Sequence, residues 1–237
     1  MTYILHYAPD NASLIVRLAL EELGVPYRTK LVDRSRAEHR TAAFRALNGA
    51  GLIPVLEVPG GPLSETAAIL LWLADRHGAL APPPRDAARG AFLKWLFFAS
   101  NTLHAQLRMI FYPAYYVGDN PAAQSQLRRT LTHRSMSHMT LPDSLNLLDA
   151  RQDAHSDADA QMPDVLDYYI ACLLRWCALY PVGETDWFNL SEYPRLATLT
   201  EDLEKRPATK AAQAAEGLGA TPFSNPTPAN PPEGSAT

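Results

Sequence analysis

One stretch of the sequence carries residues that could bind an amino-acid-like molecule. Pro54 opens the apolar run Val-Leu-Glu-Val, and Glu65 and Thr66 follow at the start of a strongly apolar helical pattern. A helix N-terminus offers free N–H groups and a partial positive charge to a carboxylate. Glu65 could pair with the α-ammonium of the same amino acid, and the Thr66 hydroxyl adds a donor. The alternative is that Ser64, Glu65 and Thr66 only cap the helix.

A second set of candidates lies in the loop after the first predicted strand. The segment from Ala8 to Ala12 is dense in turn formers, and Ser13 begins a helix. A hydroxyl or amide donor at a helix start can stabilise a bound anion, so Ser13 and Asn11 are candidate functional residues. The structural alternatives are an N-cap for Ser13 and turn formation for Asn11. Tyr7 is a further candidate, for which simple packing is the alternative.

The elements that must position these residues follow the order βαβ, α, ββα. Hydrophobic periodicity and turn residues predict these segments as strands 3–6 and 25–32, helices 13–23, 37–47 and 65–77, and a hairpin from Pro54 to about Leu63 across Pro59-Gly60-Gly61. This is the thioredoxin-like order. The opening βαβ unit should be right-handed, with its first two strands parallel.

The remainder of the chain predicts a second, helical domain. Residues 79–86 contain three consecutive prolines and read as a stiff linker between a domain at 1–78 and an all-helical domain at 87–216. Long helices are expected over 88–116 and 164–180, and another from Pro194. The polar segment 151–161 is either a flexible loop or a place where packing differs. The Pro-rich tail 217–237 is expected to be extended or disordered and unable to pack a core.

Composition narrows the class of protein. The chain has 237 residues, 47% hydrophobic, with a net charge of −4, which gives no reason to expect nucleic acid or a membrane as partner. No segment approaches the roughly 18 apolar residues of a membrane helix, and the N-terminus reads as a strand rather than a signal peptide. Cys172 and Cys177 read as buried small hydrophobes, which suits a reducing cytoplasmic setting. The seven histidines show no metal-ligand spacing, so no metal is expected.

With these motifs in this order, the sequence resembles the glutathione S-transferase family over residues 3–216, most strongly over 3–77. The resemblance implies an α+β thioredoxin-like domain followed by an all-α domain, with glutathione as co-substrate. It implies that Pro54 is cis and that the backbone before it, at Ile53, pairs with the cysteinyl part of glutathione. It also implies that Glu65 and Thr66 hold the γ-glutamyl end.

The loop resembles that of the bacterial beta-type branch, whose pattern is Pro-Gly-Ala-Cys-Ser-Leu. Here the pattern reads Pro-Asp-Asn-Ala-Ser-Leu from Pro9 to Leu14, so the branch cysteine falls on Ala12. Ala12 excludes a mixed disulfide with glutathione at this position, while Ser13 matches. The branch also carries a histidine near the glutathione sulfur, which corresponds to His104. The lysine that follows it in the branch is Ala105 here.

The resemblance places an electrophile pocket between the domains. Candidate lining residues are Tyr7, Leu107, Met109, Phe111, Tyr112 and Tyr116, which would select a small hydrophobic electrophile. In the second domain, Asp164 and Asp167 resemble the family's capping box, although an aspartate at the fourth position is short for the return bond.

Three functional hypotheses follow. The first is a glutathione transferase that conjugates glutathione to a small electrophile, with Ser13 or Asn11 stabilising the thiolate. The second is a glutathione-binding protein with little turnover, of a non-catalytic or stress-related kind. The third is another glutathione-dependent reaction, such as dehalogenation, isomerisation or peroxide reduction. The resemblance further implies a two-fold homodimer.

Overall fold

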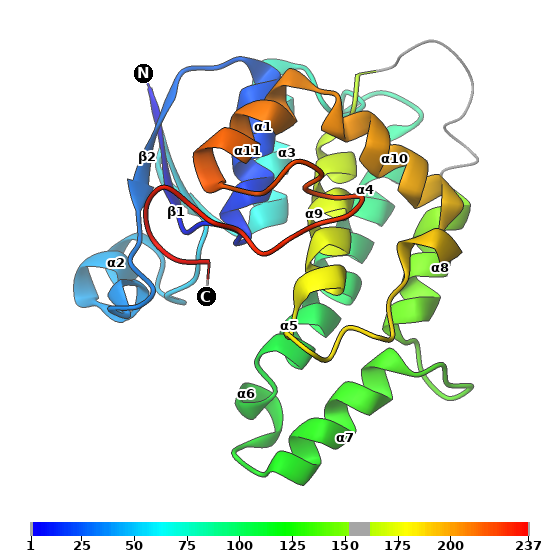
Figure 1. The fold of residues 1–237 in the computed structure, drawn as a ribbon. Coiled ribbons are helices and arrows are strands. Elements are labelled where there is room, and N and C mark those ends of the chain that lie inside the picture. The colour runs from blue at the N-terminus through cyan, green and yellow to red at the C-terminus, as the bar shows by residue number, and fades with distance from the viewer. Residues whose placement is uncertain (1, 152–161, 237) are drawn as a thin grey trace.

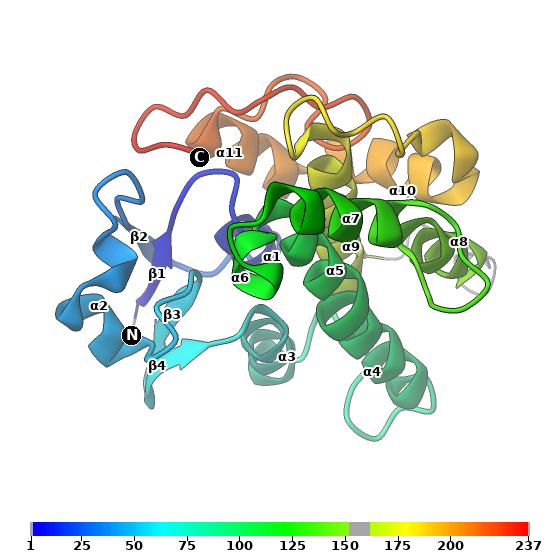
Figure 2. The same ribbon diagram turned by 90° about the horizontal axis from the view of Figure 1, so that it is seen from below.

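The computed structural model describes residues 2–151 and 162–236. A four-stranded sheet with its helices forms one end of the molecule, and a set of helices forms the other (Figures 1 and 2). The expected thioredoxin-like domain followed by a helical domain is confirmed. Among the described residues, no helix is long and apolar enough to cross a membrane.

The sheet has the order β2-β1-β3-β4. Its strands are β1 (Tyr3–Tyr7), β2 (Tyr27–Leu31), β3 (Val55–Val58) and β4 (Gly61–Ser64). β1 pairs in parallel with β2, as the βαβ pattern predicts, and antiparallel with β3. β3 and β4 form the predicted hairpin.

Helices cover both faces of this sheet. They are α1 (Ser13–Leu23), the 3₁₀ turn η1 (Glu38–Arg40), α2 (Ala42–Leu47) and α3 (Thr66–His77). Alternate residues of β1 point to opposite faces. Leu5 joins the main core with α1 and α3, whereas His6 packs edge-on against Phe44 of α2. A small separate cluster around Phe44 fills the α2 side.

The helical domain is built around α9. Its helices are α4 (Arg89–Phe98), the π-helical turn η2 (Ala99–His104), α5 (Ala105–Phe111), α6 (Ala114–Val117), α7 (Pro121–Thr132), α8 (Leu141–Arg151), α9 (Val165–Leu179), the 3₁₀ turn η4 (Leu190–Glu192), α10 (Pro194–Glu204) and α11 (Pro207–Glu216). α11 packs against α1, so the last helix lies on the first domain.

The single long helix expected over 88–116 is divided. A π-helical turn interrupts it at 99–104, and the helix ends at Phe111. Tyr112 leaves the helical region with φ −128° and ψ 55° because it precedes Pro113, and a residue before proline is sterically disfavoured in the helical region. This break allows the tyrosines that follow to turn toward the first domain.

α9 is almost completely buried, with both free cysteines in its interior. Its first turn has the predicted capping box. The Asp164 carboxylate accepts from the N–H groups of Leu166 and Asp167, and Asp167 accepts from the Asp164 N–H at 3.0 Å. The expectation that aspartate is too short for this return bond is therefore wrong. The polar segment that precedes the cap falls largely at 152–161, outside the described residues.

The tail after α11 is packed, which corrects the expectation that it is disordered or unable to join a core. It has no helix or strand, but Leu218 and Phe223 are buried in the main core. The tail doubles back on itself: the Asn230 N–H donates to the Gly217 carbonyl at 2.8 Å. Gly217 has φ +64°, and a Cβ there would lie 1.9 Å from the Asn230 carbonyl oxygen, so only glycine fits. In Figure 1 the tail, drawn in red, crosses α9 and returns past β1.

Candidate functional site

A cleft of about 980 Å³ lies between the two domains. One wall is formed by the loop after β1, the turn before β3 and the start of α3. The opposite wall comes from η2, α5 and the segment that follows α5. Trp176 and Tyr180 also line the cleft, as does Ala236 at the end of the tail. The cleft therefore brings together residues from distant parts of the chain.

The first wall contains the predicted binding motif. Ile53, Pro54, Glu65 and Thr66 all line the cleft, and the Ile53–Pro54 peptide is cis, as the resemblance implies. Glu65 precedes the first turn of α3 and its side chain makes no capping bond. Its backbone is in an unusual conformation for a residue with a side chain, at φ 68° and ψ 113°. Such strain is concentrated at functional sites. The exposed carboxylate thus stands beside the free N–H groups of a helix N-terminus.

Asn11 and Ser13 lie in different environments. Asn11 lines the cleft, and its Oδ1 accepts from the Ala12 N–H at 2.8 Å, which leaves the side-chain NH₂ group as a donor. Ser13 is fully buried. Its hydroxyl donates to the Ala8 carbonyl at 3.0 Å and accepts from the Ala8 N–H at 3.2 Å. The Ser13 side chain braces the loop rather than facing the cleft, and it is not the N-cap of α1.

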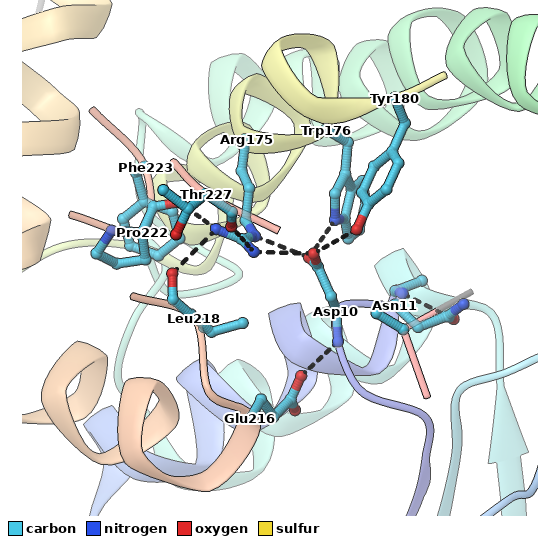
Figure 3. A network of polar contacts seen from close by, with 12 residues as sticks. Asp10, Asn11, Arg175, Trp176, Tyr180, Glu216, Leu218, Pro222, Phe223 and Thr227 are labelled. Carbon is cyan, nitrogen blue, oxygen red and sulfur yellow. Dashed lines mark hydrogen bonds and ion pairs between the residues drawn. The ribbon is translucent and has the colours of Figure 1, made fainter. Parts of the chain in front are cut away.

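Asp10 anchors the loop to α9, as Figure 3 shows. Its buried carboxylate accepts two hydrogen bonds from the Arg175 guanidinium, at 2.8 and 2.9 Å, and one each from the Trp176 indole and the Tyr180 hydroxyl, both at 2.9 Å. The backbone at Asp10 has φ 49°, a region that aspartate tolerates better than most residues. Asn11 is the next residue, so this network sets where its amide points.

Arg175 also ties the tail to the site. The remaining donors of its buried guanidinium reach the carbonyl oxygens of Leu218, Pro222 and Thr227, at 3.4, 3.0 and 3.0 Å (Figure 3). Glu216, at the end of α11, accepts from the Asp10 N–H at 2.8 Å. The charge of Arg175 is thus balanced by Asp10 and by tail carbonyls, which explains how a guanidinium can be fully buried.

Glu216 has a second partner on the first helix. Its carboxylate is paired with Arg17 of α1 at 2.7 Å. Burial raises the pKa of Glu216, while the Arg17 charge opposes that shift. The end of α11 is therefore joined to α1 by a buried ion pair as well as to the loop at Asp10.

Tyr7 is buried and does not line the cleft, contrary to the sequence-based expectation. Its hydroxyl donates to Glu233 of the tail at 2.5 Å, and the Arg17 guanidinium lies over its ring at 4.7 Å. Burial and the Glu233 carboxylate raise the pKa of Tyr7. A phenol in this setting stays protonated and serves to hold the tail.

His104 lines the opposite wall, at the end of the π-helical turn. Its Nδ1 is hydrogen-bonded to the Tyr169 hydroxyl at 2.8 Å, and its ring lies 5.6 Å from the Trp176 ring. Burial and the Arg108 charge lower the pKa of His104 to about 4. The imidazole is therefore neutral at physiological pH and can offer a hydrogen bond but no positive charge.

The residues that were predicted to line the electrophile pocket fall into two groups, one in the cleft and one in the core. Phe111, Tyr112 and Tyr116 line the cleft. Leu107 is fully buried and belongs to the core, and Met109 packs against that core rather than lining the cleft.

Some residues of the site were not found from the sequence. Arg175 is a charged residue inside an otherwise apolar helix, and that position is the signal that a buried partner must exist. Arg108 follows His104 by one helical turn, a spacing that places both on one face. Arg34 and Arg40 also line the cleft but follow no local pattern that indicates it.

Comparisons with known proteins agree with this geometry. Residues 12–76 match the family model described as "Glutathione S-transferase, N-terminal domain". A solved sphingomonad glutathione S-transferase complexed with glutathione has a TM-score of 0.70 and 27% identity, and the match covers 91% of this chain and 100% of that one. The first domain of this chain therefore resembles the N-terminal domain of glutathione S-transferases, and the whole chain has the fold of those enzymes. A second solved structure, of BphK, described as a bacterial GST in a ternary complex, matches with a TM-score of 0.71, 28% identity and the same coverage.

The curated relatives of this chain include isomerases. The maleylacetoacetate isomerase of Rhizobium meliloti (strain 1021) is 37% identical over 91 residues, 37% of this chain and 43% of the relative. The maleylpyruvate isomerase of Ralstonia sp. is 38% identical over 72 residues, 30% of this chain and 34% of the relative. This chain thus spans less than half the length of both isomerases.

A third relative matches over a longer stretch. Glutathione S-transferase GST-4.5 of Xanthomonas campestris pv. campestris is 27% identical over 180 residues, 73% of this chain and 81% of the relative.

Within the part of the chain that the structure describes, no group of three or more His, Cys, Asp or Glu residues could hold a metal ion.

Proposed function

We propose that this protein binds glutathione in the interdomain cleft and activates its thiol for attack on a small electrophile. The observation that carries the proposal is that Glu65, the N-terminus of α3, the Ile53–Pro54 turn and Asn11 line one cleft. In this arrangement the γ-glutamyl carboxylate binds the α3 N-terminus, and its ammonium pairs with Glu65. The main chain before Pro54 then holds the cysteinyl unit.

The thiol is activated by stabilising its conjugate base. The Asn11 NH₂ group donates to the sulfur, and the N-terminus of α1 adds a partial positive charge nearby. His104 acts as a neutral hydrogen-bonding partner across the cleft. The thiol proton leaves to solvent, a carbon–sulfur bond forms to the electrophile, and the leaving group departs with its electron pair.

Isomerisation is a second candidate, favoured by the two curated isomerases. In such a reaction the thiolate adds to an activated double bond, a single bond rotates, and the thiolate is expelled again. Glutathione is then not consumed. Analysis of product and residual thiol separates this reaction from conjugation.

The assembly is a second part of the proposal. A two-fold homodimer, with the first domain of one subunit packed on the helical domain of the other, is proposed from the family resemblance. A sedimentation mass corresponding to one chain would contradict it. We also place the protein in the cytoplasm, where both cysteines would stay reduced.

Glutathione titration with detection of thiolate absorbance across pH tests the proposal. The wild type should bind glutathione with a thiol pKa below that of free glutathione. Glu65→Gln should weaken binding about ten-fold or more, since a charge-assisted bond is lost, and Glu201→Gln on exposed α10 is the matched control.

Two loop variants then locate the activating group. Asn11→Ala should raise the pKa of the bound thiol. Ser13→Ala should leave it unchanged, because the Ser13 hydroxyl is bonded to Ala8. Absence of glutathione binding to the wild type would overturn the proposal, and a pKa shift only in Ser13→Ala would move the activating role to Ser13.

A further inference from the structure

Three arginines line the cleft, and the partners of their guanidinium groups are unusual. Arg34 donates to the Tyr112 hydroxyl at 2.9 Å, Arg40 to the Tyr115 hydroxyl at 2.9 Å and Arg108 to the Tyr116 hydroxyl at 2.7 Å. Arg34 also donates to the Ala236 carbonyl at 2.8 Å. Among the residues that the structure describes, no ion pair joins these three to a carboxylate. We call this set the arginine–tyrosine rim.

The rim concentrates positive charge in a protein that is acidic as a whole. The chain has 25 acidic and 21 basic residues. Among the described residues that line the cleft, however, the acidic ones are Asp10 and Glu65, against the three arginines of the rim. Asp10 is already paired with Arg175, and Glu65 lies at the start of α3. A cleft lined by one sign of charge attracts ligands of the opposite sign.

Glutathione does not use all of this charge. Its γ-glutamyl carboxylate and ammonium are satisfied by the α3 N-terminus and Glu65 in the proposed mode. Even with one guanidinium of the rim assigned to its glycyl carboxylate and a second assigned to its thiolate, the charge of the rim is not exhausted. One cation remains for the other substrate, and the three phenol rings with Phe97 and Phe111 offer flat apolar surface beside it.

We propose that the second substrate is a flat electrophile that carries a carboxylate, held by the guanidinium groups of the arginine–tyrosine rim. The inference rests on the proposed function and refines the expectation of a purely hydrophobic electrophile. A carboxylate would displace a neutral phenol oxygen from a guanidinium, because it brings an opposite charge and can accept two parallel N–H···O bonds from one guanidinium. The three tyrosines are exposed by 39%, 63% and 40%, so they can move aside.

Arg108 is the central member of the rim. It lies one helical turn after His104 on the same face, close enough for its charge to lower the pKa of that histidine. Arg34 and Arg40 come from the segment between β2 and α2, on the opposite side of the cleft. The carboxylate of the electrophile would therefore bind near His104, and the flat ring of the electrophile would lie between the two domains.

Binding of an unreactive pair of probes tests the inference first. Calorimetry would compare 3,5-dinitrobenzoate with the neutral 1,3-dinitrobenzene on glutathione-loaded and glutathione-free protein. The anion should bind at least ten-fold more tightly. Arg108→Gln and Arg40→Gln should each weaken anion binding about ten-fold and leave the neutral probe unchanged. Added salt should weaken only the anion. Arg28→Gln, an exposed arginine of β2 outside the cleft, is the control.

A reactive pair tests turnover. With 4-chloro-3,5-dinitrobenzoate and 1-chloro-2,4-dinitrobenzene, the glutathione sulfur forms a carbon–sulfur bond, the carbon–chlorine bond breaks and chloride leaves. The rate enhancement over the uncatalysed reaction should be larger for the benzoate, and Arg108→Gln should remove that difference.

The two proposals fail in different ways. Glutathione binding and turnover of both chlorides without preference, or anion affinity unchanged in Arg108→Gln, would overturn the carboxylate inference and leave the proposed function intact. Anion binding that depends on the rim without any glutathione binding would support the rim as an anion site and overturn the proposed function.

Discussion

The loop after β1 and the arginine–tyrosine rim face the same cleft but are held in opposite ways. The loop is anchored by buried charge: Asp10 is paired with Arg175, and Glu216 with Arg17. The rim is exposed, and its charged groups donate to neutral tyrosine hydroxyls. The loop contacts are therefore internal and saturated, whereas the rim retains charge that a ligand can use.

This difference separates positioning from recognition. A group that must stabilise a thiolate has to be preorganised, and a buried network provides a fixed geometry. A group that selects among electrophiles benefits from mobile side chains whose existing partners are easily displaced. Mutations in the loop network should then affect stability, and mutations in the rim should affect ligand affinity.

The largest expected effect is at Asp10. Asp10→Ala leaves Arg175 buried without its carboxylate, and breaking such a pair costs about 3–5 kcal/mol. Urea unfolding should show this loss. Asp202→Ala, which removes an exposed pair with Lys205, should change the free energy of unfolding by less than about 0.5 kcal/mol. If Asp10→Ala lowered the free energy of unfolding no more than Asp202→Ala does, the contrast between the buried loop network and the exposed rim would be wrong.

His104 should make stability depend on pH. Its pKa is about 4 in the folded protein, against about 6.5 when unfolded, so the unfolded state binds more protons between these values. The contribution of neutral His104 is present above about pH 6.5 and is lost as pH falls toward 4, by up to about 3 kcal/mol. The measurement is the difference in unfolding free energy between wild type and His104→Gln across this range.

The titration of Asp164 changes the unfolding free energy with pH in the opposite direction to that of His104. For this reason the wild type is compared with His104→Gln rather than measured alone. Burial and Asp167 raise the pKa of Asp164 to about 7, so that group favours the folded state at low pH and loses its contribution as pH rises toward 7. Asp164 is present in both proteins, so its effect cancels. The exposed His133→Gln serves as a control that should behave as wild type, and parallel curves for all three proteins would contradict the prediction.

Ser13 should have a moderate effect that is structural. Ser13→Ala leaves the buried N–H and carbonyl of Ala8 without their shared partner, at a cost of about 1–2 kcal/mol. Thermal or urea unfolding measures it, with exposed Ser191→Ala as the control. A stability equal to wild type, together with a changed thiol pKa, would show that the hydroxyl reaches the ligand instead.

The smallest effect is expected in the rim. Tyr116→Phe removes one exposed hydroxyl that accepts from Arg108, and it should alter the unfolding free energy by less than about 0.5 kcal/mol. Affinity for 3,5-dinitrobenzoate should stay within about two-fold, because the guanidinium charge and not the phenol attracts the carboxylate. A destabilisation as large as that of Ser13→Ala would mean that the rim is a structural element like the loop.

Local patterns in the sequence predicted much of the fold and one wall of the cleft. The order of strands and helices followed from periodicity and turn residues, and the hairpin register places Val55 opposite Ser64, just before Glu65. These features depend on residues that are close in the chain. The same holds for the Asp164–Asp167 capping box, whose geometry is set within one helical turn.

The sequence by itself therefore determined the thioredoxin-like order, the helical second domain and the binding motif around Pro54 and Glu65. Only the tertiary structure decided that Ser13 faces Ala8, that Asn11 faces the cleft, and that the tail packs. These outcomes depend on Asp10 and Arg175, which are 165 positions apart, and on tail carbonyls that lie 43 to 52 positions beyond Arg175. A buried charge selects its partners by three-dimensional proximity, and no local pattern records which distant carboxylate or carbonyl will satisfy it.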